Sequence, residues 1–140
     1  HRIPNDRRVI TPHEGEAARL LDVPFPKVHE SRFEAAARLQ RAYGGVAVLK
    51  GPGTIIRSGD AQALCIEGNE GMATGGMGDL LSGIIGAFLS TGRLSLFMAA
   101  CLGVTIHSRA GDIAAAGGKI GMLAEDLIPI VRRLVSGIDG

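Results

Sequence analysis

A glycine-rich segment that runs directly into an apolar helix is the part of this sequence best suited to chemistry. Residues 72–90 read MATGGMGDLLSGIIGAFLS. Glycine lets the backbone approach a ligand closely, and the first amides of a helix have no partner inside the helix. The amides of Gly75, Gly76, Met77 and Gly78 are therefore predicted to form an anion hole for a phosphate group.

Asp79 follows this glycine segment, where its carboxylate would repel a bound phosphate. A functional explanation is that Asp79 takes the proton from a substrate hydroxyl that attacks a phosphoryl group. The alternative is that Asp79 only caps the helix, as Asp residues often do. The sequence leaves both explanations open.

A second candidate segment is KGPGT, residues 50–54, which follows the apolar run VAVL. Lys50 is suited to a phosphate, and the glycines on either side of Pro52 would let a nucleotide lie against the backbone. The alternative is an ordinary turn with an exposed lysine.

The third candidate is His13, within TPHEGE at residues 11–16, at a predicted strand-to-helix turn. Functional residues are often found on such connections, although a single histidine is frequently structural or solvent-facing. His29 and His107 have no partner at metal-ligand spacing. Nothing resembles a zinc site, so no residue is assigned as a metal ligand.

The elements that must position these residues alternate between strands and helices early in the chain. Val9 and Ile10 end a strand, Thr11 is expected to cap the next helix, and Pro12 is expected at its first position. Helices are also predicted over 28–43, 79–90, 95–116 and 124–135, and strands over 46–50, 54–58 and 63–67, the last two as a hairpin. Gly83 and Gly86 are expected to allow close helix packing. The pattern favours a layered α/β fold whose sheet is incomplete in this chain.

The composition limits the class of protein. The 140 residues suffice for one domain, 46% of them are hydrophobic, and the net charge of +1 gives no basic surface for nucleic acid. No apolar run reaches the ~18 residues of a membrane span, and no signal peptide is visible. We therefore expect a cytoplasmic protein without a nucleic-acid or membrane partner. Cys65 and Cys101 are expected to be free thiols, and the Ala- and Gly-rich helices favour a homo-oligomer.

Together, the segments TPHEGEAARLL, GGVAVLKGPGTII and NEGMATGGMGDLLSGIIGAFL resemble the ADP/ATP-dependent NAD(P)H-hydrate dehydratase family of the ribokinase-like superfamily. AACLGVTIHSRAGD and GMLAEDLIPIVRRL extend the resemblance over nearly the whole chain. It implies that residues 1–140 are the C-terminal portion of one ribokinase-like domain. The implied reaction restores NADH or NADPH from its hydrate: ADP or ATP phosphorylates the ring hydroxyl, and phosphate then leaves.

The resemblance also implies a role for each candidate residue. Asp79 matches the catalytic base that contacts the hydrate, and His13 matches a hydrate-binding histidine. The nucleotide-binding positions are matched by Lys50, Gly51, Pro52, Gly53, Thr54 and Gly78. Mg²⁺ is expected to neutralise the transferring phosphate. The chain departs from the family pattern at Glu14, where proline is usual, and at Glu70, where proline or alanine is usual. A small-molecule kinase of the ribokinase-like type and a non-catalytic nucleotide-binding module remain as alternatives.

Overall fold

The strand Val46–Leu49 (β2) lies inside the sheet, with a strand on each side, and all of its side chains are buried. The computed structural model describes residues 3–137. β2 pairs in parallel with Val9–Ile10 (β1) and antiparallel with Thr54–Ser58 (β3), which pairs with Ala61–Cys65 (β4). The described residues thus form a four-stranded sheet in the order β1-β2-β3-β4.

The predicted hairpin is confirmed, but its second strand begins and ends two residues earlier than the expected 63–67. Ser58 pairs with Ala61 and Thr54 pairs with Cys65, so only Gly59 and Asp60 remain for the turn. A two-residue turn fixes the register of the strands on either side of it. The sequence pattern alone did not reveal that register.

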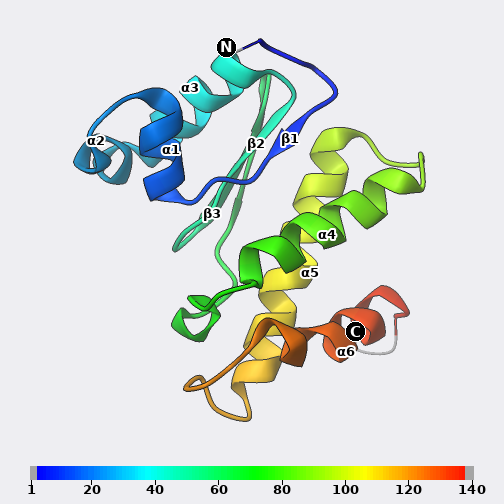
Figure 1. Cartoon of the computed structure of the whole chain (residues 1–140). Helices are drawn as coiled ribbons and strands as arrows, with labels where there is room; N and C mark the ends of the chain where they lie inside the picture. Colours follow the sequence, from blue (N-terminus) through cyan, green and yellow to red (C-terminus); the bar gives the residue numbers. More distant parts are fainter. Residues whose placement is uncertain (1–2, 138–140) are drawn as a thin grey trace.

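Helices cover both faces of the sheet (Figure 1). Ala47, Leu49 and Ile55 pack against the first group of helices, and Val46, Val48 and Ile56 pack on the opposite face, since neighbouring strand residues point to opposite sides. The first group is Glu14–Leu21 (α1), Phe25–Glu30 (α2) and Arg32–Tyr43 (α3). The second is Met77–Ser90 (α4) and Leu96–Ala115 (α5), with Ala124–Val135 (α6) packed beside them. The layered α/β class is confirmed.

The start of α1 differs from the prediction. His13, not Thr11, is the N-cap, and the helix begins at Glu14 instead of Pro12. The Nδ1 atom of His13 accepts a hydrogen bond of 3.2 Å from the Glu16 amide, and the Glu16 carboxylate accepts one of 2.7 Å from the His13 amide. This reciprocal pair is a capping box, which satisfies two amides that the helix leaves free.

The predicted helix over 28–43 is wrong in one respect, because Ser31 separates α2 from α3. Ser31 has φ −138° and ψ 56°, outside the helical region. The helix ends at Gly44 as predicted, and the φ of +73° at this residue suits glycine. Phe33, in the first turn of α3, is 51% exposed.

The bounds of α5 and α6 agree with the predicted helices over 95–116 and 124–135 to within one residue. α4 begins two residues before the predicted Asp79, at Met77, and a short 3₁₀ helix, Glu70–Met72 (η1), lies inside the preceding glycine segment. Gly83 and Gly86 are exposed with open space around them, so the expectation that they allow close packing is wrong. Gly103 has that role instead, because a Cβ atom there would lie 2.6 Å from Cγ1 of Ile85.

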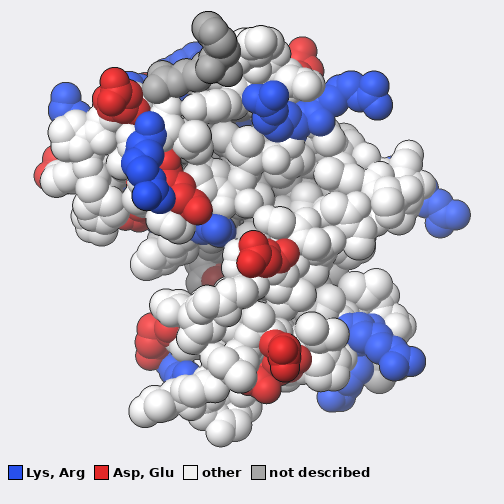
Figure 2. Space-filling view, in the orientation of Figure 1, with Lys and Arg blue, Asp and Glu red and all other residues white. Residues whose placement is uncertain are grey.

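The surface carries charges of both signs in small groups. Figure 2 shows acidic and basic side chains scattered among uncharged ones over the face it presents. This distribution agrees with the formal net charge of +1. Among the described residues, no helix is both long enough and apolar enough to cross a membrane. Cys65 and Cys101 are free and half-buried against the α4–α5 side of the sheet.

Candidate active site

The start of α4 leaves its first amides without a capping side chain. Gly76 is the N-cap, with φ +85°, a left-handed conformation that favours glycine. The amides of Met77, Gly78 and Asp79 belong to the first turn, so they have no acceptor within the helix. The predicted anion-hole residues therefore lie at a helix start that can accept a negatively charged group.

The segment before α4 is anchored to α5. Asp112, on α5, accepts hydrogen bonds of 2.9 Å from the Gly68 amide and from Nδ2 of Asn69. The Asn69 side chain in turn caps η1 by accepting a bond of 3.0 Å from the Gly71 amide. These contacts fix where the glycine segment leaves the sheet, and thereby where α4 begins.

Glu70, one of the two departures from the family pattern, belongs to this segment. Its carboxylate is 2.9 Å from Nζ of Lys119. The hydrogen bond from Lys119 lowers the pKa of Glu70, with its own backbone hydrogen bond contributing in the same direction. The charge of Glu70 is thus paired with a lysine.

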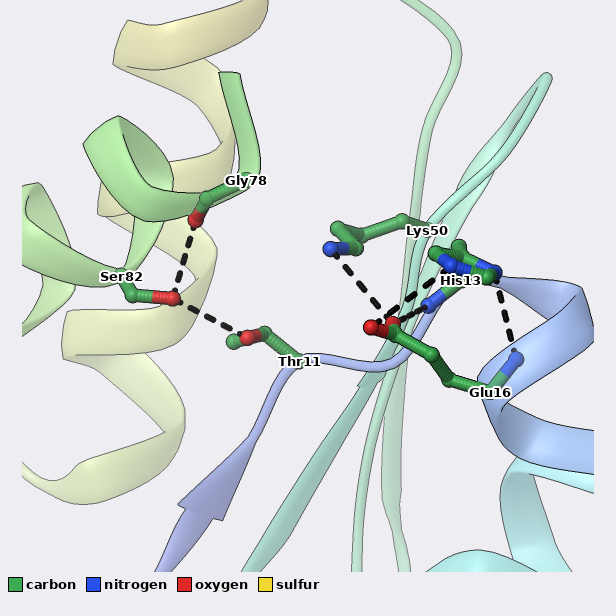
Figure 3. Close-up of polar contacts among 6 residues, drawn as sticks. All are labelled: Thr11, His13, Glu16, Lys50, Gly78 and Ser82. Carbon is green, nitrogen blue, oxygen red and sulfur yellow. Dashed lines mark hydrogen bonds and ion pairs between the residues drawn. The ribbon is translucent and has the colours of Figure 1, made fainter. Parts of the chain in front are cut away.

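Lys50 lies between the start of α1 and the start of α4 (Figure 3). Its backbone forms a parallel β-bridge with His13, and its amide donates a 2.9 Å hydrogen bond to the Pro12 carbonyl. Its Nζ atom is 3.8 Å from Oε2 of Glu16. On the other side, a Cβ atom built on Gly78 would lie 2.8 Å from Nζ. The Lys50 ammonium therefore occupies the space that the missing side chain of Gly78 leaves.

A second contact joins β1 to α4 next to this point. Oγ1 of Thr11 and Oγ of Ser82 are 3.1 Å apart, and the Ser82 hydroxyl donates a 3.0 Å bond to the Gly78 carbonyl. Figure 3 shows these hydroxyls on one side and the His13, Glu16 and Lys50 group on the other. The structure thus brings together residues that are far apart in the sequence.

The predicted site residues divide into those that meet and those that only lie nearby. Lys50 contacts both His13, through a backbone bridge, and Gly78, through its ammonium. The segment from Gly51 to Gly53 is the turn that follows Lys50, and Thr54 is the first residue of β3. Asp79 is exposed in the first turn of α4, one residue beyond Gly78.

Glu16 is a residue of this site that the sequence interpretation did not assign. Burial raises its pKa, but the His13 amide bond and the positive charge of Lys50 outweigh that effect, so the pKa lies below its usual value. Glu16 is thereby ionised and holds both the His13 turn and the Lys50 ammonium. A signal was available, because a glutamate three residues after an N-cap is the mark of a capping box.

His107, on α5, is a second residue without an assigned role. It is 7% exposed, and its Nε2 atom is buried without a hydrogen-bond partner among the described residues. Burial lowers its pKa to about 4; the Met77 backbone opposes this shift, and Lys50 adds to it. A neutral histidine therefore lies beneath the first turn of α4.

No group of three or more His, Cys, Asp or Glu side chains within residues 3–137 is arranged to hold a metal ion. Magnesium in phosphoryl-transfer sites is usually held by one or two carboxylates together with the phosphates of the substrate. The exposed carboxylate of Asp79 beside the anion hole fits that kind of site.

Comparison with known proteins places this geometry in a family. The NAD(P)H-hydrate dehydratase family model matches residues 2–133. The bifunctional NAD(P)H-hydrate repair enzyme of Vibrio cholerae is 50% identical over 131 residues, which are 93% of this chain and 26% of that protein. The ADP-dependent (S)-NAD(P)H-hydrate dehydratase of Neisseria meningitidis is 40% identical over 129 residues, which are 90% of this chain and 43% of that protein.

A solved structure supports the same grouping. It is the ADP/ATP-dependent NAD(P)H-hydrate dehydratase from Bacillus subtilis, co-crystallized with ATP/Mg²⁺ and soaked with CoA; the TM-score is 0.87 at 28% identity, over 99% of this chain and 53% of that one. A ribokinase-like superfamily protein from Enterococcus faecalis gives a TM-score of 0.73 at 31% identity, over 96% of this chain and 44% of that one. The chain spans about a quarter of the bifunctional relative and about half of the solved dehydratase. With its α/β fold of the ribokinase-like type, it belongs to the NAD(P)H-hydrate dehydratase family.

Proposed function

We propose that the protein containing this chain restores NADH or NADPH from its hydrate by using ADP or ATP as the phosphate donor. The observation that carries the proposal is Lys50, whose backbone pairs with His13 and whose ammonium lies against Gly78 at the uncapped start of α4. A helix start and an ammonium group favour a polyphosphate there. The names of the dehydratase relatives give the substrate class.

In the proposed reaction, Asp79 takes the proton of the ring hydroxyl. The hydroxyl oxygen then forms a bond to the terminal phosphorus of the nucleotide. The bond between that phosphorus and the bridging oxygen breaks, and the shortened nucleotide leaves with the electron pair. The ring phosphate ester then loses phosphate together with a ring proton, which restores the double bond. Charge stabilisation in the transfer step comes from Lys50 and the α4 amides.

His13 is proposed to bind the hydrate, and the segment from Lys50 to Thr54 together with Gly78 is proposed to bind the nucleotide. Magnesium would enter with the nucleotide, held mainly by its phosphates and by water beside the exposed Asp79, and would neutralise phosphate charge. We also propose that residues 1–140 are the C-terminal portion of one ribokinase-like domain, a proposal supported by the match to about half of the solved dehydratase. The expected homo-oligomer and the cytoplasmic location stay predictions.

The test is an assay of the protein expressed from its complete reading frame with hydrated NADH and either ADP or ATP. We expect the absorbance of reduced nicotinamide to return with at least one of the two nucleotides. A phosphorylated product that persists would favour the small-molecule kinase instead.

Gly76, not Asp79, is the N-cap of α4, so Asp79→Asn distinguishes a catalytic base from an acidic residue that only stabilises the first turn of the helix. Loss of the base should lower kcat by roughly 10²-fold or more, while calorimetry should still detect ATP binding. Asp60→Asn, an exposed carboxylate in the turn between β3 and β4, is the control that should keep its activity. Full turnover by Asp79→Asn would show that Asp79 is not the base and leave it only the favourable place of an acidic side chain in the first turn of α4.

A further inference from the structure

An ion pair that the proposed reaction does not use joins the first residues of α1 and α3. Nε of Arg32 is 2.8 Å from Oε1 of Glu14, and the two side chains are only 17% and 12% exposed. The other carboxylate oxygen of Glu14 is 2.8 Å from Nδ1 of His29. Because the pair is largely shielded from water, salt screens it less than a surface pair.

The Arg32 guanidinium also lies against the turn that follows Lys50. Its Nη1 atom donates a hydrogen bond to the Pro52 carbonyl. A Cβ atom built on Gly51 would lie 2.8 Å from Nη2 of Arg32 and 3.3 Å from Oε1 of Glu14, and Gly51 has φ +150°. Position 51 therefore requires glycine for two reasons: its backbone conformation, and the lack of space for a Cβ atom beside the ion pair.

A turn built from Gly51, Pro52 and Gly53 would have wide conformational freedom without such a contact, because glycine restricts the backbone little. Only the guanidinium, held in place by Glu14, connects the Pro52 carbonyl to another element among the hydrogen bonds of the described residues. Nη2 is buried without a hydrogen-bond partner in the same part of the chain. The turn is therefore held from outside by one side chain, which is itself held by Glu14.

Glu14 directly follows His13, the N-cap of α1. The same ion pair thus reaches the turn proposed to bind the hydrate and the turn proposed to bind the nucleotide. We propose that Glu14 and Arg32 are positioning residues that hold the Gly51–Gly53 turn in the conformation that accepts the nucleotide. This inference rests on the proposed function in that the nucleotide is taken to bind at this turn.

Two substitutions remove the ion pair from opposite sides. Arg32→Gln removes the guanidinium. Glu14→Pro removes the carboxylate while preserving the helix start, because Glu14 is the first residue of α1 and proline is favoured there. His13 has φ −80° and ψ 171°, the extended conformation that a residue before proline prefers.

The matched control is Arg41→Gln on the same helix. It breaks the ion pair between Arg41 and Glu34, whose atoms are 2.9 Å apart but whose side chains are 61% and 62% exposed. An exposed pair contributes little, and this one does not touch the turn.

The measurements are calorimetric titration with ATP and MgCl₂, steady-state kinetics, and hydrogen exchange of the amides of residues 50, 51, 53 and 54, all on the protein from its complete reading frame. Arg32→Gln and Glu14→Pro should each raise the ATP Kd by about tenfold, the cost of losing a charged hydrogen-bond partner. The kcat at saturating nucleotide should stay unchanged, and the turn amides should exchange faster without nucleotide. The double variant should bind ATP no more weakly than the worse single variant, because the two residues act as one unit.

Wild-type ATP affinity in either single variant would overturn the inference, as would unchanged hydrogen exchange of the turn in Arg32→Gln. If Arg32→Gln does not fold, Glu14→Pro decides the question alone. A wild-type protein that binds no ATP would overturn the proposed function and the nucleotide part of this inference. Faster exchange in Arg32→Gln would then still establish that the ion pair holds the turn.

Discussion

Lys50 connects three segments through separate parts of one residue. Its backbone pairs with His13, its ammonium approaches Glu16, and the same ammonium fills the space above Gly78. A lysine held by a single carboxylate at 3.8 Å keeps donors available for a phosphate, since an ammonium has three. At the residue scale, the site depends on where this ammonium lies.

Gly78→Ala tests that position. Gly78 has no positive φ, so alanine is compatible with the backbone, but its methyl group would displace the flexible end of Lys50. We expect the nucleotide KM to rise by roughly tenfold, equivalent to about one charged hydrogen bond. The unfolding free energy should stay equal or rise by up to about 1 kcal/mol, because alanine favours the helix.

The control for this substitution is Gly86→Ala on the same helix, where the added methyl group meets open space. It should leave the nucleotide KM unchanged. A Gly78→Ala protein with a wild-type KM would mean that the ammonium does not need its present position.

At the element scale, the packing of α4 on α5 fixes the direction in which the anion hole faces. Gly103 of α5 packs so closely against Ile85 of α4 that no Cβ atom fits between them, whereas Gly83 and Gly86 face open space. The sequence predicted a glycine-dependent helix contact but assigned it to the wrong residues. Glycine in a helix looks the same in sequence whether it faces a neighbour or solvent, so only the packing decided which one is needed.

Gly103→Ala should therefore destabilise the protein. The new Cβ atom would lie 2.6 Å from Cγ1 of Ile85, so that side chain must shift, while the Ile85 Cα atom already lies at contact distance, 3.4 Å away. Such overpacking costs about 1–3 kcal/mol. Urea unfolding followed by circular dichroism would show a lower midpoint.

The paired substitution Gly83→Ala should have the opposite sign. Its position is exposed with no atom within reach of the new methyl group, so the helix gains about 0.5–1 kcal/mol from the loss of glycine. Equal midpoints for the two variants would contradict the packing of α4 against α5 described above.

At the scale of the whole molecule, His107 couples folding to pH. Burial, as the largest cause, lowers its pKa from 6.5 to about 4, and the charge of Lys50 adds to the shift. In the unfolded chain, His107 therefore binds a proton below about pH 6.5, whereas in the folded chain it does so only below about pH 4. Stability should fall as the pH drops through this window, by about 3 kcal/mol in total.

The measurement is urea unfolding at several pH values between 7 and 4.5, compared with His107→Gln, which cannot titrate. The lower limit avoids Glu16 and Glu70, whose pKa values lie below the usual 4.5, so their contributions are lost only at more acidic pH. The wild-type protein should lose stability over this range more steeply than the variant. Identical slopes would show that His107 does not stay neutral in the fold.

The sequence by itself determined the strands, the three long helices of the second half, and the glycine-rich start of α4. These follow from local causes: the buried run VAVL, the apolar spacing of α4 and α6, and glycines placed before a helix. The family resemblance was likewise carried by contiguous segments, and the match over residues 2–133 confirms it.

Only the tertiary structure decided that Lys50 lies between His13 and Gly78, that Glu16 completes this group, and that Arg32 reaches the Pro52 carbonyl. Each of these contacts joins residues on different elements, or depends on a cap that His13 forms in place of Thr11. Their geometry is set by strand register and by helix packing across the sheet. Neither quantity is encoded in a local pattern, because each depends on which distant surfaces are buried against one another.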